Sequence, residues 1–231
     1  TFNPTQIEQN FYGLEEILSK GKIVVLNMNI AEYKNLSKII AAYLKLDFQS
    51  EVLSRLAQNN KNKTRPVAFI SDEYHEYITE TDADFFAQSR EAKCINIVST
   101  QSYSSLKNSL KDENAVKVII QNLINKIWFR TDDIFTIEEA QKQLGKEEKI
   151  HTSRAISENA KETKFNYITN SLNSQNSSIT ESFNTYTQKD FMYDTNFFTQ
   201  ELETFSALTF LSDGFHIISP SKLKMLPYFK K

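Results

Sequence analysis

The amino-acid sequence predicts an α/β fold with a mainly parallel sheet flanked by helices. Short apolar runs rich in β-branched residues alternate with longer segments of helical periodicity, which is typical of βαβ units. The run at residues 67–70 is apolar throughout, as expected for a strand buried on both faces of a parallel sheet. The four expected strands are residues 22–28, 67–70, 94–100 and 125–130.

Composition supports a folded domain with a sizeable core. The chain has 231 residues, of which 40% are hydrophobic, including 17 Phe and 10 Tyr, so it is long enough for one large domain or two small ones. The formal net charge of −2 and the pI of about 6.0 exclude an overall basic field that would attract nucleic acid or anionic membranes. A local basic patch is compatible with this balance.

Cysteine content and hydropathy narrow the class of protein further. Cys94 is the single cysteine, which rules out an intramolecular disulfide and fits a reducing compartment or simple burial. No apolar run has the length of a membrane span, and no signal peptide is visible. Because the chain begins at Thr1 without a methionine, we expect it to be a fragment of a longer protein.

Helices are expected around and between the strands. Residues 1–20 carry apolar residues at helical spacing, Ile7 and Phe11 among them, and end at Gly21. Residues 31–59 contain neither Gly nor Pro and repeat apolar residues every three or four positions, which predicts a long helix packed on the sheet. The remaining expected helices are residues 85–92, 116–123 and 134–144.

The composition changes after residue 145. Residues 146–181 are polar, with a Ser- and Asn-rich centre, and are expected to form a loop, a flexible hairpin or a disordered segment. Residues 182–231 supply a short helix at 197–202 and a hairpin around Ser212-Asp213-Gly214 that closes the edge of the sheet. We therefore expect residues 182–231 to return to the domain that residues 1–145 begin.

Two adjacent carboxylates, Asp72 and Glu73, follow the apolar run at 67–70. In open α/β sheets, ligands bind just beyond the carboxyl ends of the strands. In a nucleoside triphosphatase the first acid of such a pair holds Mg²⁺ directly or through water, and the second polarises the attacking water. An acidic pair after an apolar run also occurs by chance, as solvated loop acids.

Three further polar residues follow the strands or lie between them. Gln101 follows the strand at 94–100, where it is placed to sense a γ-phosphate or to cap the next helix. Arg90, on the intervening helix, is a candidate for completing a neighbouring subunit's site, or it pairs with Asp84 or Glu91. Arg130 after the fourth strand is a second candidate for this role, although a salt bridge to Asp132 or Asp133 is favoured.

The chain lacks a glycine-rich phosphate loop. Its only glycines are Gly13, Gly21, Gly145 and Gly214, and their spacing fits neither GxxxxGK[ST] nor GxGxxG. Both motifs need backbone that only glycine tolerates close to phosphate. If the chain binds a nucleotide, its phosphate loop must therefore lie outside these residues.

Several motifs in order resemble the conjugative coupling proteins of the TraG/TraD type. These are hexameric, inner-membrane-anchored motors of type IV secretion that are related to the FtsK/HerA ATPases. The resemblance covers most of residues 20–145 and extends more loosely to residues 208–214 and 223–228. The motifs that carry it are KIVVLNM at 22–28 with AEY at 31–33, FISDE at 69–73, FFAQSREA at 85–92, STQS at 99–102 and IWFRT at 127–131.

Carried over by position, the resemblance implies a RecA-like nucleotide-binding domain that binds ATP and Mg²⁺. It implies that Asp72 and Glu73 are the Walker B pair, with Asp72 ordering Mg²⁺ and Glu73 activating water. It makes Gln101 the sensor of the γ-phosphate and Arg90 the arginine supplied in trans. Residues 1–145 would then be the C-terminal part of that domain, and the phosphate loop and transmembrane anchor would precede Thr1.

The resemblance also implies partners and a location. The parent would form a homo-hexamer at the cytoplasmic face of the bacterial inner membrane, with only the absent anchor in the membrane. It would pump single-stranded DNA with its bound relaxase towards the components of a type IV secretion channel, while the isolated fragment would be inactive. The rival hypothesis is a non-catalytic α/β recognition module that binds relaxosome or effector proteins. A viral or chromosomal DNA pump would share the motor chemistry.

Other clusters of polar residues give weaker signals. The basic groups Lys61, Lys63 and Arg65, and then Lys146, Lys149 and Arg154, would grip phosphates if a ring concentrated them at a pore, although solvated loops explain each group alone. The three histidines show no metal-ligand spacing with one another or with Cys94, so no zinc site is expected.

Overall fold

The computed structural model describes residues 13–28, 30–57, 65–159, 164–168, 171–173, 178–227 and 229. Contacts divide the chain into two compact units, of which the first comprises residues 1–139 and 195–231 and the second residues 140–194. Among the described residues, no helix combines the length and the apolar character needed to cross a membrane.

The first unit begins with helices that the sequence predicts in outline. Helix α1 (Leu14–Lys20) buries Ile17 and ends at Gly21, whose positive φ of 66° is the left-handed conformation that glycine adopts readily. Helices α2 (Ile30–Tyr33) and α3 (Asn35–Ala57) replace the single long helix expected at 31–59. Ile7, Phe11, Lys61 and Lys63 lie outside the described residues.

The expectation of a strand at residues 22–28 is wrong. The segment has no strand partner among the described residues, and its apolar side chains face solvent, with Ile23 91% and Val25 81% exposed. β-Branched residues favour a pleated, half-buried surface rather than an extended backbone as such. Without a neighbouring strand or a packed face, the composition of the segment is not enough to form a strand.

A parallel pair of strands forms the centre of the first unit. Strands β1 (Val67–Ser71) and β2 (Cys94–Val98) pair in parallel, with Val67 opposite Cys94 and Ser71 opposite Val98. The connection between them contains the short helix η1 (Tyr74–Glu76) and helix α4 (Asp82–Ser89). Helices α5 (Tyr103–Leu110) and α6 (Glu113–Asn122) follow β2 and begin at the side-chain caps Ser102 and Asp112.

The remaining strands of this unit are antiparallel. Strand β8 (Ser206–Ser212) pairs with both β3 (Lys126–Phe129) and β9 (Ile217–Lys224), so the expected C-terminal hairpin does close against an earlier strand. The α/β class is confirmed. The expectation of a mainly parallel sheet is not met, because among the described strand pairs of this unit β1–β2 is parallel and the pairs β3–β8 and β8–β9 are antiparallel. Helix α7 (Ile134–Leu144) follows β3, and the π-helical turn η2 (Phe197–Glu201) precedes β8.

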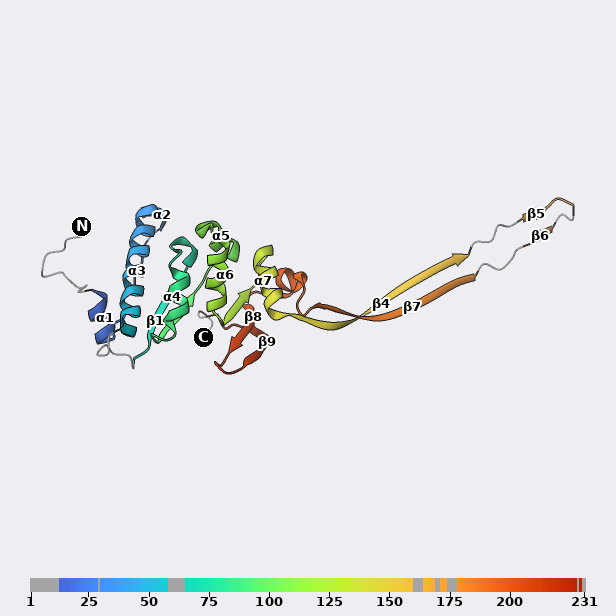
Figure 1. Cartoon of the computed structure of the whole chain (residues 1–231). Coiled ribbons are helices and arrows are strands. Elements are labelled where there is room, and N and C mark those ends of the chain that lie inside the picture. Colours follow the sequence, from blue (N-terminus) through green and yellow to red (C-terminus); the bar gives the residue numbers. More distant parts are fainter. Residues whose placement is uncertain are drawn as a thin grey trace. The chain divides into compact units, whose positions relative to one another are not determined.

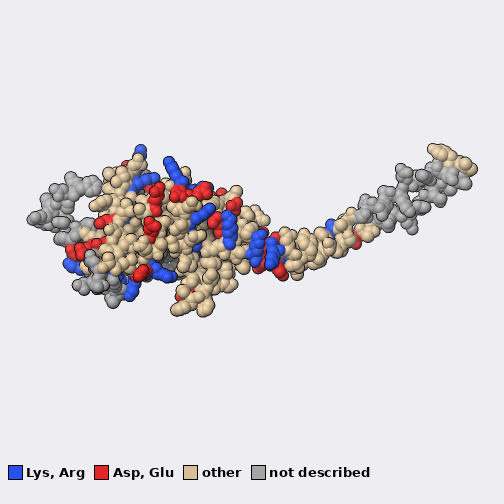
Figure 2. All heavy atoms as spheres, viewed as in Figure 1, with Lys and Arg blue, Asp and Glu red and all other residues tan. Residues whose placement is uncertain are grey.

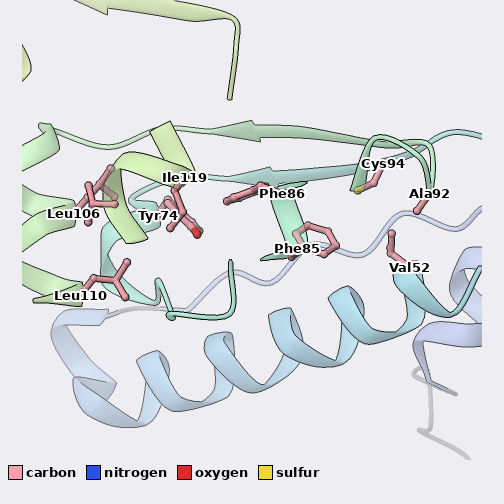
Figure 3. Close-up of a cluster of buried hydrophobic side chains, with 10 residues drawn as sticks. Val52, Tyr74, Phe85, Phe86, Ala92, Cys94, Leu106, Leu110 and Ile119 are labelled. Carbon is pink, nitrogen blue, oxygen red and sulfur yellow. The ribbon is translucent and has the colours of Figure 1, made fainter. Parts of the chain in front are cut away.

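The core of the first unit lies between β1–β2 and the helices. Figure 1 shows α3, α4 and α6 side by side, and Figure 3 shows side chains of the core cluster between the strands and α3. Phe48 of α3 stacks on Phe69 of β1 with a centroid distance of 5.6 Å. The buried cluster consists of Val52, Tyr74, Phe85, Phe86, Ala92, Cys94, Leu106, Leu110, Val116 and Ile119.

The second unit is dominated by a long two-stranded ribbon (Figure 1). Strands β4 (Lys146–Asn159) and β7 (Ser178–Phe191) pair antiparallel along their whole lengths, and β5 (Lys164–Asn166) pairs with β6 (Ser171–Asn173) beyond them. Of the three alternatives left open for residues 146–181, a hairpin is the one that forms. Its second strand continues to Phe191, past the expected end of this segment.

Candidate functional site

The candidate site lies at the carboxyl ends of β1 and β2. Because these strands are parallel, the residues that follow them emerge at the same edge. Two backbone hydrogen bonds join the two strand ends, from Ser99 N to Ser71 O at 2.9 Å and from Tyr74 N to Ser99 O at 2.9 Å. The loop that carries Asp72 and Glu73 is therefore fixed directly to the loop that carries Gln101.

Asp72 is exposed and held through one of its carboxylate oxygens. The Ser99 hydroxyl and the backbone N–H of Glu73, the latter at 3.0 Å, both donate to Oδ1 of Asp72. The Tyr77 hydroxyl donates to the Asp72 carbonyl at 2.8 Å and lies 2.6 Å from the Ser71 hydroxyl. Burial raises the pKa of Tyr77, so this phenol remains a donor at neutral pH.

Glu73 is oriented by Gln101, a contact that the sequence does not indicate. Nε2 of Gln101 lies 3.2 Å from Oε1 and 3.3 Å from Oε2 of Glu73, so the amide faces both carboxylate oxygens. Nδ1 of His75 lies 3.4 Å from Oε2 of Glu73 and 3.3 Å from the Thr100 hydroxyl. The carboxylate of Glu73 is thus bracketed by an amide and an imidazole while remaining partly exposed.

The backbone at Glu73 is unusual. Its φ of 49° and ψ of 44° place it in the left-handed region, which costs a residue with a Cβ roughly 1–2 kcal/mol. Such conformations persist where the surroundings fix them, and they cluster at functional sites. Here the two strand-end hydrogen bonds hold the turn in which Glu73 sits.

A buried polar network joins this loop to helix α3. Asp82 and Lys45 are almost fully buried, with Nζ of Lys45 at 2.6 Å from Oδ2 of Asp82. Lys45 also donates to the Tyr77 carbonyl at 2.7 Å, and the Tyr74 hydroxyl donates to Asp82. Gln49 donates to Oδ1 of Asp82 at 2.8 Å, and the backbone N–H and hydroxyl of Thr79 donate to the same carboxylate. Helix α3 is thereby bonded to the loop that follows Glu73.

The protonation of this network follows from its geometry. Burial by itself would raise the pKa of Asp82, but the Lys45 ammonium and the hydrogen bonds from Lys45, Tyr74 and Gln49 together lower it below the ordinary value. Burial lowers the pKa of Lys45 in spite of the opposing charge of Asp82. We treat the pair as ionised, since every described donor around Asp82 favours the carboxylate.

A cleft of about 620 Å³ adjoins Gln101. Its walls come from the residues that follow β2 and from those that follow β3, and Asp133 anchors one to the other. Oδ1 of Asp133 accepts from the Ser104 hydroxyl at 2.5 Å, and Oδ2 accepts from the Thr136 N–H at 2.9 Å. Burial acts to raise the pKa of Asp133, and these hydrogen bonds lower it overall. The cleft is lined by Gln101, Ser102, Ser104, Ser105, Thr131, Asp132, Asp133, Ile134 and Phe135.

Asp133 and Ser104 are site residues that the sequence did not single out. The sequence indicates Asp133 only as a partner for Arg130. In the structure Arg130 is exposed and has no ion pair with a described residue, so the favoured salt bridge is not formed. The signal that could have found Asp133 is its place directly before the helical periodicity of residues 134–144, where Asp is a preferred N-cap residue.

Arg90 stands apart from the acidic pair. It follows α4, at the end where the chain enters β2, and the backbone there joins the start of β1 through a bond from Val67 N to Lys93 O at 3.0 Å. Because β1 and β2 are parallel, this is the opposite edge from Asp72 and Glu73. Arg90 is exposed, and no ion pair with Asp84 or Glu91 is described. Its action within the same site is excluded by topology.

The donor set of the site is compatible with magnesium. Among the described residues no group of three or more His, Cys, Asp or Glu side chains is placed to hold a metal ion. Mg²⁺ does not need such a group, because it keeps several waters and is bound through one or two carboxylates together with substrate phosphates. The exposed Asp72 carboxylate, at a strand end, is a hard oxygen ligand of this kind.

Comparison with known proteins places the chain among proteins of bacterial conjugation. A family model described as the TraM recognition site of TraD and TraG matches residues 66–195. The structure is similar to the bacterial conjugative coupling protein TrwBdeltaN70 in its unbound monoclinic form, with 13% identity and a TM-score of 0.62. It is also similar to the trigonal form in complex with sulphate, with 12% identity and a TM-score of 0.63.

Each alignment covers 93% of this chain and 43% of the TrwBdeltaN70 chain, so the chain spans less than half the length of the structures that it matches. At this identity the likeness concerns the fold. No curated protein sequence matched the chain.

Proposed function

The chain belongs to the TraG/TraD family of conjugative coupling proteins, and we propose that it forms part of an ATP-driven motor that couples the relaxosome to a type IV secretion channel. The observation that carries the proposal is the arrangement of Glu73 and Gln101. Two side chains from different strand ends meet at the edge where an α/β sheet binds its ligands, and the amide faces both oxygens of the carboxylate.

In this proposal each residue of the pair has a separate task. Asp72, held by Ser99 through one oxygen, holds Mg²⁺ through water, and the ion when bound would neutralise charge on the phosphates of ATP. Glu73 accepts a hydrogen bond from the attacking water and orients it. Gln101 keeps the carboxylate in place and reports whether a γ-phosphate is present. The glycine-rich phosphate loop comes from residues outside these 231.

The remaining catalytic group, an arginine, comes in this proposal from a neighbouring subunit of the assembled ring. Because Arg90 lies at the edge opposite Glu73, it can serve the chemistry only at the site of a neighbouring subunit, where it would stabilise charge on the transferring phosphoryl group. The proposal therefore requires a ring, as in a homo-hexamer at the cytoplasmic face of the inner membrane. Single-stranded DNA with its relaxase is the cargo of such a ring.

The proposal is tested with Glu73→Gln in a longer natural chain that includes the phosphate loop. We expect DNA-stimulated ATP hydrolysis to fall by about 100-fold or more, because the group that polarises water is lost, while nucleotide still binds. Glu80→Gln is the matched control, since Glu80 is an exposed acid in the same connection. Equal hydrolysis by the wild type and Glu73→Gln would refute the assignment.

A recognition module is the second candidate. The family description names a recognition site for the relaxosome protein TraM, and no glycine-rich phosphate loop occurs in these residues. In that case the chain would bind a TraM-type protein with the same affinity whether or not Glu73 is replaced by Gln. Binding measured by calorimetry on the 231-residue chain, together with absent hydrolysis in the longer chain, would favour this candidate.

A further inference from the structure

His75 lies beside the Glu73 carboxylate and connects the two strand ends. It belongs to η1, which follows β1, and its Nδ1 lies 3.3 Å from the hydroxyl of Thr100, which follows β2. The same nitrogen lies 3.4 Å from Oε2 of Glu73. The His75 side chain is 13% exposed and that of Glu73 is 42% exposed, so the imidazole is the more buried partner.

The hydrogen bonds of Thr100 assign a proton to Nδ1 of His75. The Thr100 hydroxyl donates its single proton to the Ser102 carbonyl at 3.2 Å, because a carbonyl oxygen can only accept. Oγ1 of Thr100 is then left as an acceptor towards His75, and the Glu73 carboxylate is an acceptor as well. Both neighbours of Nδ1 therefore require the hydrogen on this nitrogen, and the network assigns the Nδ1–H tautomer.

The other ring nitrogen faces a second charged pair. Nε2 of His75 lies 3.6 Å from Oε1 of Glu76, and Oε2 of Glu76 forms an ion pair with Lys38 of α3. The ring is therefore enclosed between Thr100 on one side and Glu76 on the other. Its orientation is set by groups other than Glu73, as is needed for a side chain that orients this carboxylate.

The donors around Glu73 are distributed unequally between its two oxygens. Oε2 faces two of them, Nδ1–H of His75 at 3.4 Å and Nε2 of Gln101 at 3.3 Å, whereas Oε1 faces Gln101 alone at 3.2 Å. A carboxylate has about four lone-pair sites, two on each oxygen. With respect to the donors that the structure describes, Oε2 is thus filled and Oε1 keeps one site open.

We propose that His75 is a positioning residue for the activation of water, which donates from Nδ1 to Oε2 of Glu73 and leaves Oε1 to accept a hydrogen bond from the attacking water. This inference rests on the proposed function, in which Glu73 orients that water. Rotation of the carboxylate about its Cγ–Cδ bond would carry Oε1 away from the water. Two donors on Oε2, one from each strand-end loop, oppose this rotation.

Two substitutions separate the N–H donor of His75 from its ring. His75→Phe keeps a ring and loses the donor, while His75→Asn loses the ring and keeps an N–H close to the place of Nδ1. In a longer natural chain that includes the phosphate loop, His75→Phe should lower kcat for DNA-stimulated ATP hydrolysis by about tenfold and leave KM within about twofold. His75→Asn should stay within about threefold of the wild type, because the donor to the carboxylate remains.

A purely structural role of His75 predicts the reverse order of the two variants. Phe fills the space of the imidazole and Asn does not, so Asn would then be the more damaging residue. That order, or a wild-type kcat in His75→Phe, would overturn the proposal. His216→Phe is the matched control, since the His216 side chain is 86% exposed between β8 and β9, and it should leave kcat unchanged.

A double substitution shows whether His75 acts through Glu73. The loss caused by His75→Phe should vanish in the Glu73→Gln background, because the group that His75 orients is already absent. A further loss of about tenfold in that background would assign the effect of His75 to another group and refute the proposal.

The tautomer of His75 is measured without any assay of hydrolysis. Nitrogen-15 NMR of the imidazole rings in the 231-residue chain, with His75→Phe to identify the signal, should show the neutral ring of His75 protonated at Nδ1. A ring protonated only at Nε2 would contradict the proposal, because Nδ1 would have no hydrogen to donate.

Failure of the motor hypothesis has a different signature. Normal hydrolysis by Glu73→Gln would refute the activation of water by Glu73 and the role of His75 together. Loss of hydrolysis in Glu73→Gln with a wild-type kcat in His75→Phe would refute the role of His75 alone and leave the proposed function standing.

Discussion

At the scale of the residue, Glu73 combines a strained backbone with the side chain to which we assign the activation of water. Glycine adopts a φ of 49° without the Cβ penalty, so Glu73→Gly should stabilise the 231-residue chain by about 1 kcal/mol and abolish hydrolysis in the longer chain. Chemical denaturation measures the first effect and phosphate release the second.

Lys93→Gly is the control, because Lys93 has a φ of 55° outside the site. It should stabilise to a similar extent and leave hydrolysis unchanged. Destabilisation by Glu73→Gly would show instead that the hydrogen bonds around Glu73 outweigh the strain in its backbone.

Asp82 is the residue on which the support of the site depends. Asp82→Asn leaves the Lys45 ammonium buried without its counter-charge and should destabilise the chain by about 3 kcal/mol or more. Asp84→Asn, at an exposed position of the same helix, should change stability by about 0.5 kcal/mol at most. Equal effects of the two substitutions in urea denaturation would show that the buried pair contributes nothing.

The same pair predicts a pH dependence. The folded-state pKa of Asp82 lies below its value of 3.8 in the unfolded chain, so the unfolded state binds the proton more readily. The contribution of the carboxylate is therefore complete well above pH 4 and is lost as the pH falls through the folded-state pKa. As the pH falls below the unfolded-state value of 3.8, the stability of Asp82→Asn should accordingly decrease less steeply than that of the wild type.

At the scale of the element, the β4–β7 ribbon is bonded mainly to itself. Replacing residues 153–184 by Asn-Gly joins the paired residues Thr152 and Thr185 through a two-residue turn. We expect the first unit to keep its melting temperature within about 3 °C, because none of its core side chains belongs to the deleted segment. Circular dichroism gives the melting curve, and loss of cooperative unfolding would show that the ribbon stabilises the first unit.

The surface of the ribbon also limits what it can bind. In the view of Figure 2, coloured charges gather near the beginning of β4, and most of the rest of the described ribbon is uncharged. The basic group expected to grip phosphates is largely neutralised by neighbouring acids, with Arg154 bonded to Glu181 and Lys149 3.6 Å from Glu147. The described part of the ribbon therefore offers no concentrated positive charge of the kind that nucleic acid requires.

At the scale of the whole molecule, the proposed function assigns only part of a catalytic site to these residues. Because they contain no glycine-rich loop, the 231-residue chain should hydrolyse no ATP above background, with or without single-stranded DNA. The longer chain should be active and should respond to DNA. Phosphate release from both chains, under identical conditions, measures the difference. If the 231-residue chain hydrolysed ATP and Glu73→Gln abolished that hydrolysis, the whole site would lie within these residues.

The class of fold and the identity of the candidate site residues follow from the sequence alone. Continuous apolar runs and helical periodicity identified β1, β2, β3 and most helices, because these signals arise from neighbouring residues along the chain. Asp72, Glu73 and Gln101 were found because strand ends in an α/β fold lie at one edge. Their roles in catalysis remain predictions.

Features that depend on distant partners became visible in the tertiary structure. The strand expected at 22–28 does not form because a strand requires a neighbour, which local composition cannot supply. The contact of Gln101 with Glu73, the burial of Lys45 with Asp82, and the position of Arg90 at the opposite edge all depend on how β1 and β2 pair. Pairing joins residues far apart in sequence, so the pattern within any one segment does not contain it.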